Sequence, residues 1–153
     1  MQSSEDEKWM REALMEAAEA EASGDVPVGA VVVLAGRVVG RGRNRRVVNQ
    51  DPLAHAEVEA LRDAAATVRS WRFDEASLYV TLEPCPMCAG AIVQSRVGSL
   101  IVGALDARFG AVRSVFQVCD DPRTTHRVRV RSGILADECA GILSEFFKPR
   151  RSQ

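Results

Sequence analysis

The chain has no long hydrophobic run and no basic leading segment, and each absence excludes a class of protein. Its longest apolar stretch, Val28 to Ala35, is far shorter than the roughly 18 residues that a membrane-spanning helix needs. The first 24 residues are acidic and lack the basic start of a signal peptide, so we expect a cytoplasmic protein with no membrane partner. Since we find no repeat or linker, the length predicts a single domain over residues 1–153.

Lysine is also scarce, because 18 of the 20 basic residues are arginine. Residues 1–25 hold eight acids and two bases. The rest of the chain therefore has 18 bases and 13 acids, although the formal net charge of the whole chain is −1. Arginine forks bind phosphate groups well, and the composition therefore permits an anionic partner without requiring one. A hydrophobic content of 46% is that of a globular protein and excludes wholesale disorder.

Hydrophobic periodicity predicts helices and strands that alternate along the chain. A capping box at Ser4 and Glu7 opens a helix of about 20 residues, which Gly24 ends. Further helices are expected from Asp51-Pro52, over 84–95 and over 137–147, and strands over 28–34, from Val38, and over 77–82, 100–102 and 128–130. Residues 43–51 are predicted to be irregular, and a basic tail without regular structure is expected over 148–153. This order indicates an α/β fold, a mixed sheet with helices on its faces.

Two short segments carry the residues that point to chemistry. His55-Ala56-Glu57 lies at the start of a predicted helix, and Pro84 to Cys88 follows a strand and opens the next helix. Cys85 and Cys88 are three residues apart, so a helical turn places both sulfurs on one side. With the His55 imidazole they make a donor set that Zn²⁺ prefers. We therefore predict one Zn²⁺ per chain where the two helix starts meet.

Three protein ligands leave one position of a tetrahedral site open, which is the pattern of catalytic zinc. Zinc lowers the pKa of water in such a position to near neutrality. Proton transfer then requires an acid–base group beside that water, and Glu57 is the candidate because it shares the first helical turn with His55. H-x-E followed by P-C-x-x-C is the signature of zinc-dependent nucleobase deaminases, so the pattern predicts hydrolytic deamination without an organic cofactor.

Two other interpretations of these residues stay open at this point. One is a closed structural zinc site completed by His126, Cys119 or Cys139, which leaves Glu57 without a role. The other is a redox dithiol of Cys85 and Cys88, which leaves the histidine and the glutamate unexplained. The catalytic interpretation accounts for every member of the two segments.

The sequence resembles the cytidine/deoxycytidylate deaminase superfamily and, within it, the bacterial tRNA-specific adenosine deaminases. The zinc motif alone indicates only the superfamily, whereas the Asp106 segment and Gly133 to Cys139 are more particular to the tRNA enzymes. The resemblance runs from about Trp9 to Phe147, and its matching stretches are 26–31, 44–45, 54–57, 78–91, 103–104, 106–107 and 133–139.

This resemblance implies a three-layer α/β/α cytidine-deaminase-like fold, with a mixed five-stranded sheet and helices on both faces. It also implies a homodimer that hydrolyses adenosine to inosine at the wobble position of the tRNA anticodon loop. His55, Cys85 and Cys88 match the zinc ligands, and Glu57 matches the proton shuttle. The residues that match substrate-binding positions are Asn44, Asp106, Val28 and Ala56.

The chain departs from the family pattern in the region expected to touch RNA. Leu105 stands where the family usually has arginine, and Val115 to Gln117 and Thr125 also differ. These departures motivate one alternative, the deamination of a free purine or pyrimidine base or nucleoside by the same zinc chemistry. The basic balance of residues 26–153 motivates a second, a catalytically silent zinc-stabilised RNA-binding module.

Overall fold

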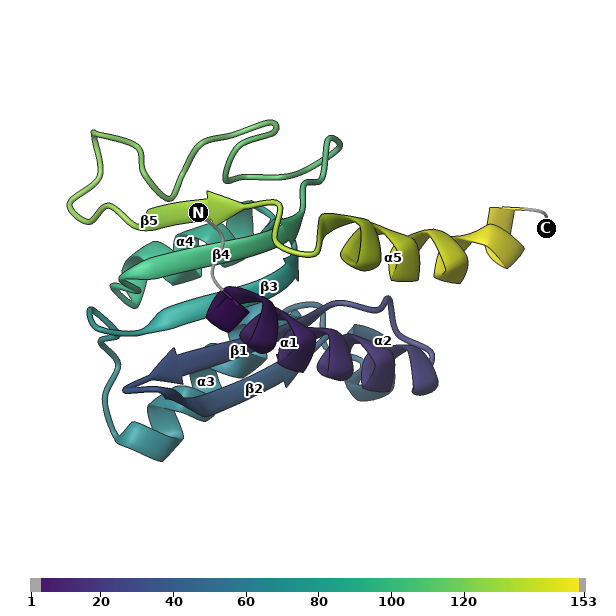
Figure 1. The fold of residues 1–153 in the computed structure, drawn as a ribbon, viewed down its shortest axis with the longest axis horizontal. Helices are drawn as coiled ribbons and strands as arrows, with labels where there is room; N and C mark the ends of the chain where they lie inside the picture. The colour runs from purple at the N-terminus through teal and green to yellow at the C-terminus, as the bar shows by residue number, and fades with distance from the viewer. Residues whose placement is uncertain (1–3, 152–153) are drawn as a thin grey trace.

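A mixed five-stranded sheet forms the middle of the molecule in the computed structural model, which describes residues 4–151 (Figure 1). The strands are β1 (Gly29–Leu34), β2 (Arg37–Arg43), β3 (Ser77–Leu82), β4 (Ser99–Ala104) and β5 (Arg129–Ser132), in the order β2-β1-β3-β4-β5. β1 pairs antiparallel with both β2 and β3, while β3, β4 and β5 run parallel. The carboxyl ends of β3 and β4 therefore lie together at one edge, where α/β sheets place their ligands.

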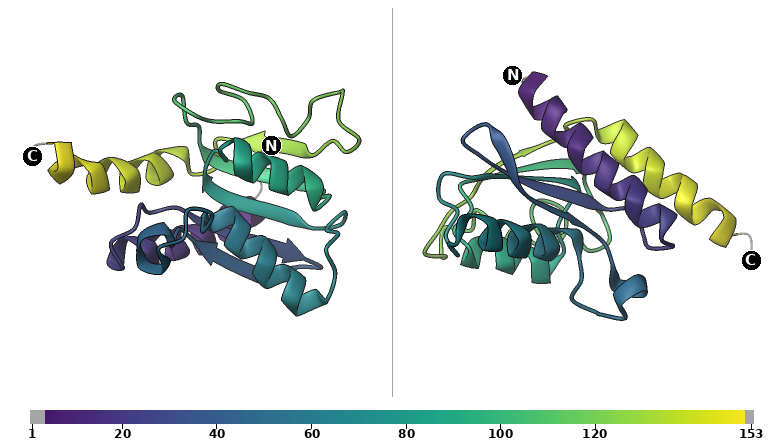
Figure 2. Two further views of the ribbon diagram at one scale, coloured as in Figure 1. Left: turned by 180° about the vertical axis from the view of Figure 1, so that it is seen from behind. Right: turned by 90° about the horizontal axis from the view of Figure 1, so that it is seen from below.

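Helices cover both faces of this sheet (Figure 2). One face carries α1 (Ser4–Ala22) and α5 (Ala136–Arg151), and the other carries α3 (Ala56–Val68) and α4 (Pro86–Gln94). A short helix, α2 (Arg46–Asn49), follows β2. The predicted α/β/α layering with a mixed five-stranded sheet is thus confirmed. Within residues 4–151, no helix has both the length and the apolar character needed to cross a membrane.

Successive side chains of each strand point to opposite faces of the sheet, so the apolar residues form two cores. One set of strand residues packs against α1 and α5, together with Trp9 and Met10 of α1. The neighbouring residues point to the other face and pack against α3 and α4. The first core includes Val31, Val33, Tyr79 and Ile101, and the second includes Ala30, Val32, Leu78, Val80, Ala60 and Ile92.

Three regions differ most from the sequence prediction. The helix expected from Pro52 begins at Ala56, because the Asp51 carboxylate accepts the Leu53 N–H at 2.9 Å and closes a turn there. Residues 46–49, predicted to be irregular, form α2. The final helix continues to Arg151, so the unstructured tail predicted from 148 is wrong as far as 151, and 152–153 lie outside the described residues.

A glycine in β2 allows the first turn of α3 to pack closely against the sheet. A Cβ on Gly42 of β2 would lie 2.2 Å from the Ala56 carbonyl oxygen. Only glycine lets the two backbones approach this closely. The close contact fixes the first turn of α3, which carries Glu57, relative to β2.

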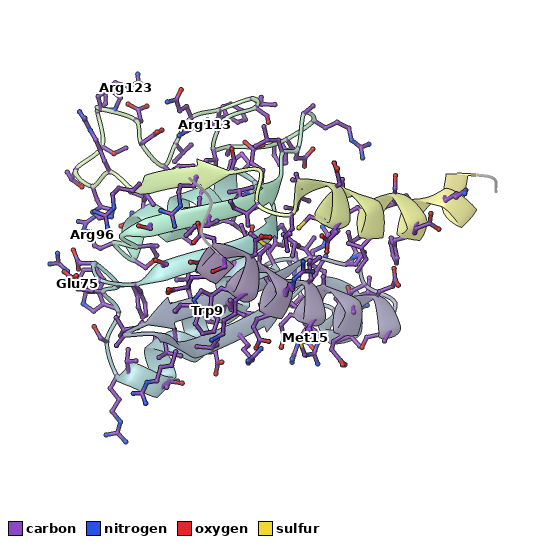
Figure 3. All side chains as sticks on the ribbon, in the orientation of Figure 1. Trp9, Met15, Glu75, Arg96, Arg113 and Arg123 are labelled. Carbon is purple, nitrogen blue, oxygen red and sulfur yellow. The ribbon has the colours of Figure 1, made fainter. Side chains whose placement is uncertain are left out.

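A long loop without helix or strand connects β4 to the parallel strand β5. It spans residues 105–128, and Figure 3 labels Arg113 and Arg123 on it. Its first part, 105–109, lies at the carboxyl end of β4, next to the residue that follows β3. The loop therefore begins at the ligand-binding edge of the sheet.

A buried ion-pair network on the α1 face ties three elements together. Asp6 of α1 accepts a 2.7 Å hydrogen bond from the Tyr79 hydroxyl and two 3.0 Å bonds from the Arg131 guanidinium. Asp6 as a whole residue is 4% exposed. The network joins α1 to β3 and β5 on the face opposite α3 and α4.

Asp6→Asn is expected to lower the free energy of unfolding by about 2 kcal/mol. The asparagine cannot accept both guanidinium bonds, which leaves a partly buried charge short of its partner. Urea denaturation followed by circular dichroism measures the change. A loss below about 0.5 kcal/mol, the range of ordinary surface substitutions, would contradict this assignment.

Candidate active site

A cavity of about 760 Å³ opens where α3 and α4 begin, at the carboxyl ends of β3 and β4. Its volume lies in the range of small-molecule binding sites. Seven of the eight residues selected from the sequence line it: Val28, Asn44, His55, Ala56, Glu57, Cys85 and Asp106. The eighth, Cys88, is fully buried and is not among the lining residues.

Three metal-ligating groups converge beside this cavity. His55 is the N-cap of α3, Cys85 is the N-cap of α4, and Cys88 follows in the first turn of α4. The His55 Nδ1 atom lies 3.7 Å from the Cys85 Sγ and 3.4 Å from the Cys88 Sγ. All three donor atoms lie within 4.8 Å of one another. The two helix starts therefore meet as expected, although His55 precedes the first turn rather than lying in it.

The electrostatics of the cluster fit a bound cation. Hydrogen bonds from the Cys88 thiol and from His55 lower the pKa of Cys85 to about 4, so this sulfur is a thiolate at neutral pH. The hydrogen bond to Cys85 and burial raise the pKa of Cys88. Two sulfurs and one imidazole nitrogen, one sulfur already anionic, form a donor set suited to a borderline-soft divalent metal.

Glu57 is a buried carboxyl group next to the metal-ligating set. It is 4% exposed and lies in the first turn of α3, two residues after His55. Burial raises its pKa to about 7. A carboxyl group with a pKa near neutrality can both accept and donate a proton under working conditions, which suits general acid–base catalysis.

The Asn44 side chain lies in the cavity wall with its amide orientation fixed. It is 7% exposed and follows β2 directly. Its Oδ1 atom accepts the Arg46 N–H at 3.2 Å, and only an oxygen can accept from that donor. The Nδ2 group therefore remains available to donate to a ligand. Val28 and Ala56 supply apolar parts of the same wall.

Asp106 lies at the start of the long loop, where it stabilises a local turn. Its Oδ1 accepts the Arg108 N–H at 3.0 Å, and its own N–H donates to Glu83 at 2.9 Å. Glu83 follows β3, is 3% exposed and also lines the cavity. Burial favours its protonated form, but hydrogen bonds from Ser114 and from loop N–H groups outweigh burial and lower its pKa to about 2.

Several parts of the cavity wall lie outside the set of site residues selected from the sequence. Helix α5 contributes one side, and the sequence gives no local signal for this because the helix reads only as an amphipathic segment. Arg46 and Arg108 bring two guanidinium groups to the lining, and Leu105 and Phe109 are more than half exposed beside them. The α5 residues in the wall are Ala140, Leu143, Ser144 and Phe147.

The residues considered for a closed metal site lie elsewhere in the structure. Cys119 is buried in the core on the α3 and α4 face, and Cys139 in the core on the α1 and α5 face. The His126 Nε2 atom is 2.7 Å from the Val97 carbonyl oxygen. Within residues 4–151, the cluster of donors is His55, Cys85 and Cys88 alone. A tetrahedral ion held by these three donors would have one further position for solvent or substrate.

Comparisons with known proteins agree with this geometry. The family model of MafB19-like deaminases matches residues 4–151. The chain is 50% identical over 149 residues to the tRNA-specific adenosine deaminase of Haemophilus influenzae, covering 97% of this chain and 86% of the relative. The chain belongs to the family of tRNA-specific adenosine deaminases. The enzyme of the same name from Bacillus subtilis is 44% identical over 149 residues, covering 97% and 92%.

Solved structures of the family and its relatives share the fold. A structure from a study of A-to-I editing by tRNA:A34 deaminases at the wobble position matches with a TM-score of 0.85 and 43% identity, covering 89% of this chain and 99% of that one. Guanine deaminase from Nitrosomonas europaea matches at 0.76 and 26% identity, covering 92% and 83%. The superfamily and family expected from the motifs are therefore confirmed.

Proposed function

We propose that this chain hydrolyses the wobble adenosine of a tRNA anticodon loop to inosine, with one Zn²⁺ per chain. The observation that carries the proposal is a buried glutamate of pKa about 7 beside converging imidazole and thiol donors, in a chain half identical to a tRNA-specific adenosine deaminase. Neither the donors nor the acid–base group requires an organic cofactor. A tRNA substrate implies a cytoplasmic location for the chain.

His55, Cys85 and Cys88 would hold the zinc ion. When bound, zinc supplies an activated water nucleophile at neutral pH. The helix starts that carry these ligands point their free N–H groups toward the site, and this favours the thiolate forms that metal binding requires.

Glu57 carries the protons of the reaction. Hydrolysis adds water at C6 of the purine and releases ammonia. One proton of the water must reach ring nitrogen N1, where inosine keeps it, and the second must pass from the C6 hydroxyl to the departing amine. A single carboxyl group of pKa about 7 can perform these transfers in turn and ends in its starting state.

The cavity wall fits a base extruded from a single-stranded loop. The Asn44 Nδ2 group donates to an acceptor on the base, while Val28 and Ala56 contact its apolar faces. Arg46 and Arg108 lie in the lining, where they contact phosphates flanking the extruded nucleotide, and Asp106 contacts the anticodon backbone beside it. Single-stranded loops are the usual targets of sequence-specific RNA binding because their bases can be unstacked.

Asn44→Asp is expected to raise the KM for tRNA about tenfold. Aspartate keeps the oxygen that accepts the Arg46 N–H but replaces the amide donor with a second acceptor, so one hydrogen bond to the base is lost. Steady-state kinetics on a tRNA transcript measures the change. Asn49→Asp, at the last residue of α2, is the control, and an equal KM for Asn44→Asp and wild type would contradict the role.

The experiment that tests the proposed function measures inosine in a tRNA transcript bearing a wobble adenosine. We expect conversion by the wild-type chain and none in a transcript with guanosine at that position. An absence of inosine in the presence of bound zinc would reject the proposal.

A second candidate function is deamination of a free base. It is favoured by the match to the guanine deaminase of Nitrosomonas europaea and by Leu105, which replaces the usual arginine beside Asp106. Ammonia release from free guanine, adenine or cytosine, undiminished by excess tRNA, would support this candidate over the tRNA substrate.

We also propose that the chain is a homodimer. Large apolar side chains are exposed along the loop after β4, and exposed apolar patches mark interaction sites. Sedimentation equilibrium at micromolar concentration is expected to give twice the chain mass of 16.7 kDa. The exposed side chains are Leu105, Phe109, Val115 and Phe116.

A further inference from the structure

Glu83 is a buried carboxylate that the proposed reaction does not use. It follows β3, two residues before Cys85, and its carboxylate accepts hydrogen bonds from the loop after β4. In the described structure it accepts hydrogen bonds from five groups of that loop. A charge this deeply buried is stable only when its oxygens are satisfied, and here the loop satisfies them.

The two carboxylate oxygens hold different parts of the loop. Oε2 accepts the N–H groups of three consecutive residues, Val112, Arg113 and Ser114, at 3.0, 2.7 and 2.9 Å. Oε1 accepts the Asp106 N–H at 2.9 Å and the Ser114 hydroxyl. One side chain therefore clamps the beginning of the loop, at Asp106, to a turn six to eight residues later.

Further contacts make this clamp rigid. A Cβ on Gly110 would lie 2.3 Å from the Glu83 carboxyl carbon, so the loop backbone packs directly on the carboxylate. The Ala111 N–H donates to the Pro84 carbonyl at 2.8 Å, and the Glu83 N–H donates to the Ala104 carbonyl at 2.8 Å. The loop is thus bound to the same short segment, 83–85, that presents the first metal-ligating cysteine.

The clamped part of the loop is part of the cavity wall. Residues 105–109 all line the cavity, and they include Asp106 and Arg108, which contact the RNA backbone in the proposed function. We propose that Glu83 is a positioning residue. It fixes the position of residues 105–109 relative to the metal-ligating cluster and thereby determines the affinity for tRNA. The inference rests on the proposed function for its kinetic consequence, whereas the clamp itself is tested independently.

The substitution Glu83→Gln tests the hydrogen bonds of this clamp selectively. The single carbonyl oxygen of glutamine can keep the three N–H bonds of 112–114 only if its NH₂ group takes the place of Oε1. The Ser114 hydroxyl can rotate to accept from that group, but the Asp106 N–H then faces a donor and loses its partner. Glu83→Gln therefore releases the end of the loop that lines the cavity.

We expect Glu83→Gln to raise the KM for tRNA about tenfold, the effect of one lost hydrogen bond, and to change kcat by less than about threefold. Zinc content should stay at one per chain, and amide hydrogen exchange should become faster within 105–114. Asp6→Asn is the matched control, since it also removes a buried, multiply bonded carboxylate but on the opposite face of the sheet. It should lower the melting temperature without changing KM.

Three results would overturn the inference: an unchanged KM in Glu83→Gln, an equal rise of KM in Asp6→Asn, or unchanged exchange within 105–114. If Glu83→Gln does not fold, Gly110→Ala replaces it, because its methyl group displaces the carboxylate while keeping both oxygens. A normal KM in that variant would also overturn the inference. If the wild type forms no inosine, the proposed function fails, and the exchange measurement still decides whether Glu83 clamps the loop.

Discussion

Glu57→Gln is expected to lower kcat for inosine formation by about a thousandfold, with zinc content and melting temperature close to those of the wild type. Glutamine has nearly the shape of glutamate but cannot take or give the protons of the reaction, and general acid–base catalysis contributes within this range. The buried position of Glu57 in the first turn of α3 leaves the metal ligands in place when its charge is removed. Single-turnover measurement of inosine on a tRNA transcript gives the rate of the chemical step.

The matched control for this variant is Glu59→Gln. Glu59 lies two residues further along the same helix, is only partly buried and is not part of the cavity wall. Its variant should retain the wild-type rate. A Glu57→Gln enzyme within tenfold of the wild type would show that another group moves the protons, and the assignment would then be wrong.

Cys88→Ala is expected to abolish both zinc binding and activity. Removing one of three protein ligands leaves only the His55 nitrogen and the Cys85 sulfur, which are too few to retain the ion. Loss of a group that only hydrogen-bonds to a metal ligand weakens metal affinity roughly 10–100-fold. Loss of a direct ligand should therefore weaken zinc affinity more than about 100-fold. Elemental analysis after dialysis against a competing chelator measures retention, and the inosine assay measures activity.

Cys119→Ala provides the control for Cys88→Ala, because both cysteines are fully buried. Cys119 packs in the apolar core, and its replacement removes a similar sulfur without removing a metal ligand. This variant should keep one zinc per chain and wild-type activity. Retention of zinc by Cys88→Ala, or its loss from Cys119→Ala, would contradict the ligand set.

The metal-ligating cluster was predictable because its signals are local. The segments that hold His55 and Cys85 each lie at the start of a helix, and the starts of two neighbouring helices can lie close together. The sequence prediction began this helix at Pro52 and so placed His55 inside its first turn. The Asp51 turn delays the start of α3 to Ala56 and leaves His55 as the N-cap. Asn44 and Asp106 were selected only through resemblance to the family, because an isolated turn residue carries no pattern of its own.

The clamp at Glu83 and the wall from α5 could not be predicted from local sequence. Glu83 contacts groups more than 20 residues away, in a loop whose 24 residues show no periodicity. Helix α2 is a similar case, because the N–H groups of Val47 and Val48 donate to the buried Asp25 carboxylate, which lies before β1. These features depend on tertiary packing, which periodicity and propensity do not encode.

X-ray absorption at the zinc edge, on the wild-type chain purified without added metal, tests the central claim most directly. The claim is that one imidazole and two thiolates hold the ion and leave one position to solvent. We expect one zinc per chain, surrounded by two sulfur atoms and two lighter atoms, with one light ligand lost in the alanine variant of His55. A chain free of metal, or a zinc ion bound by three or four sulfurs, would contradict the account.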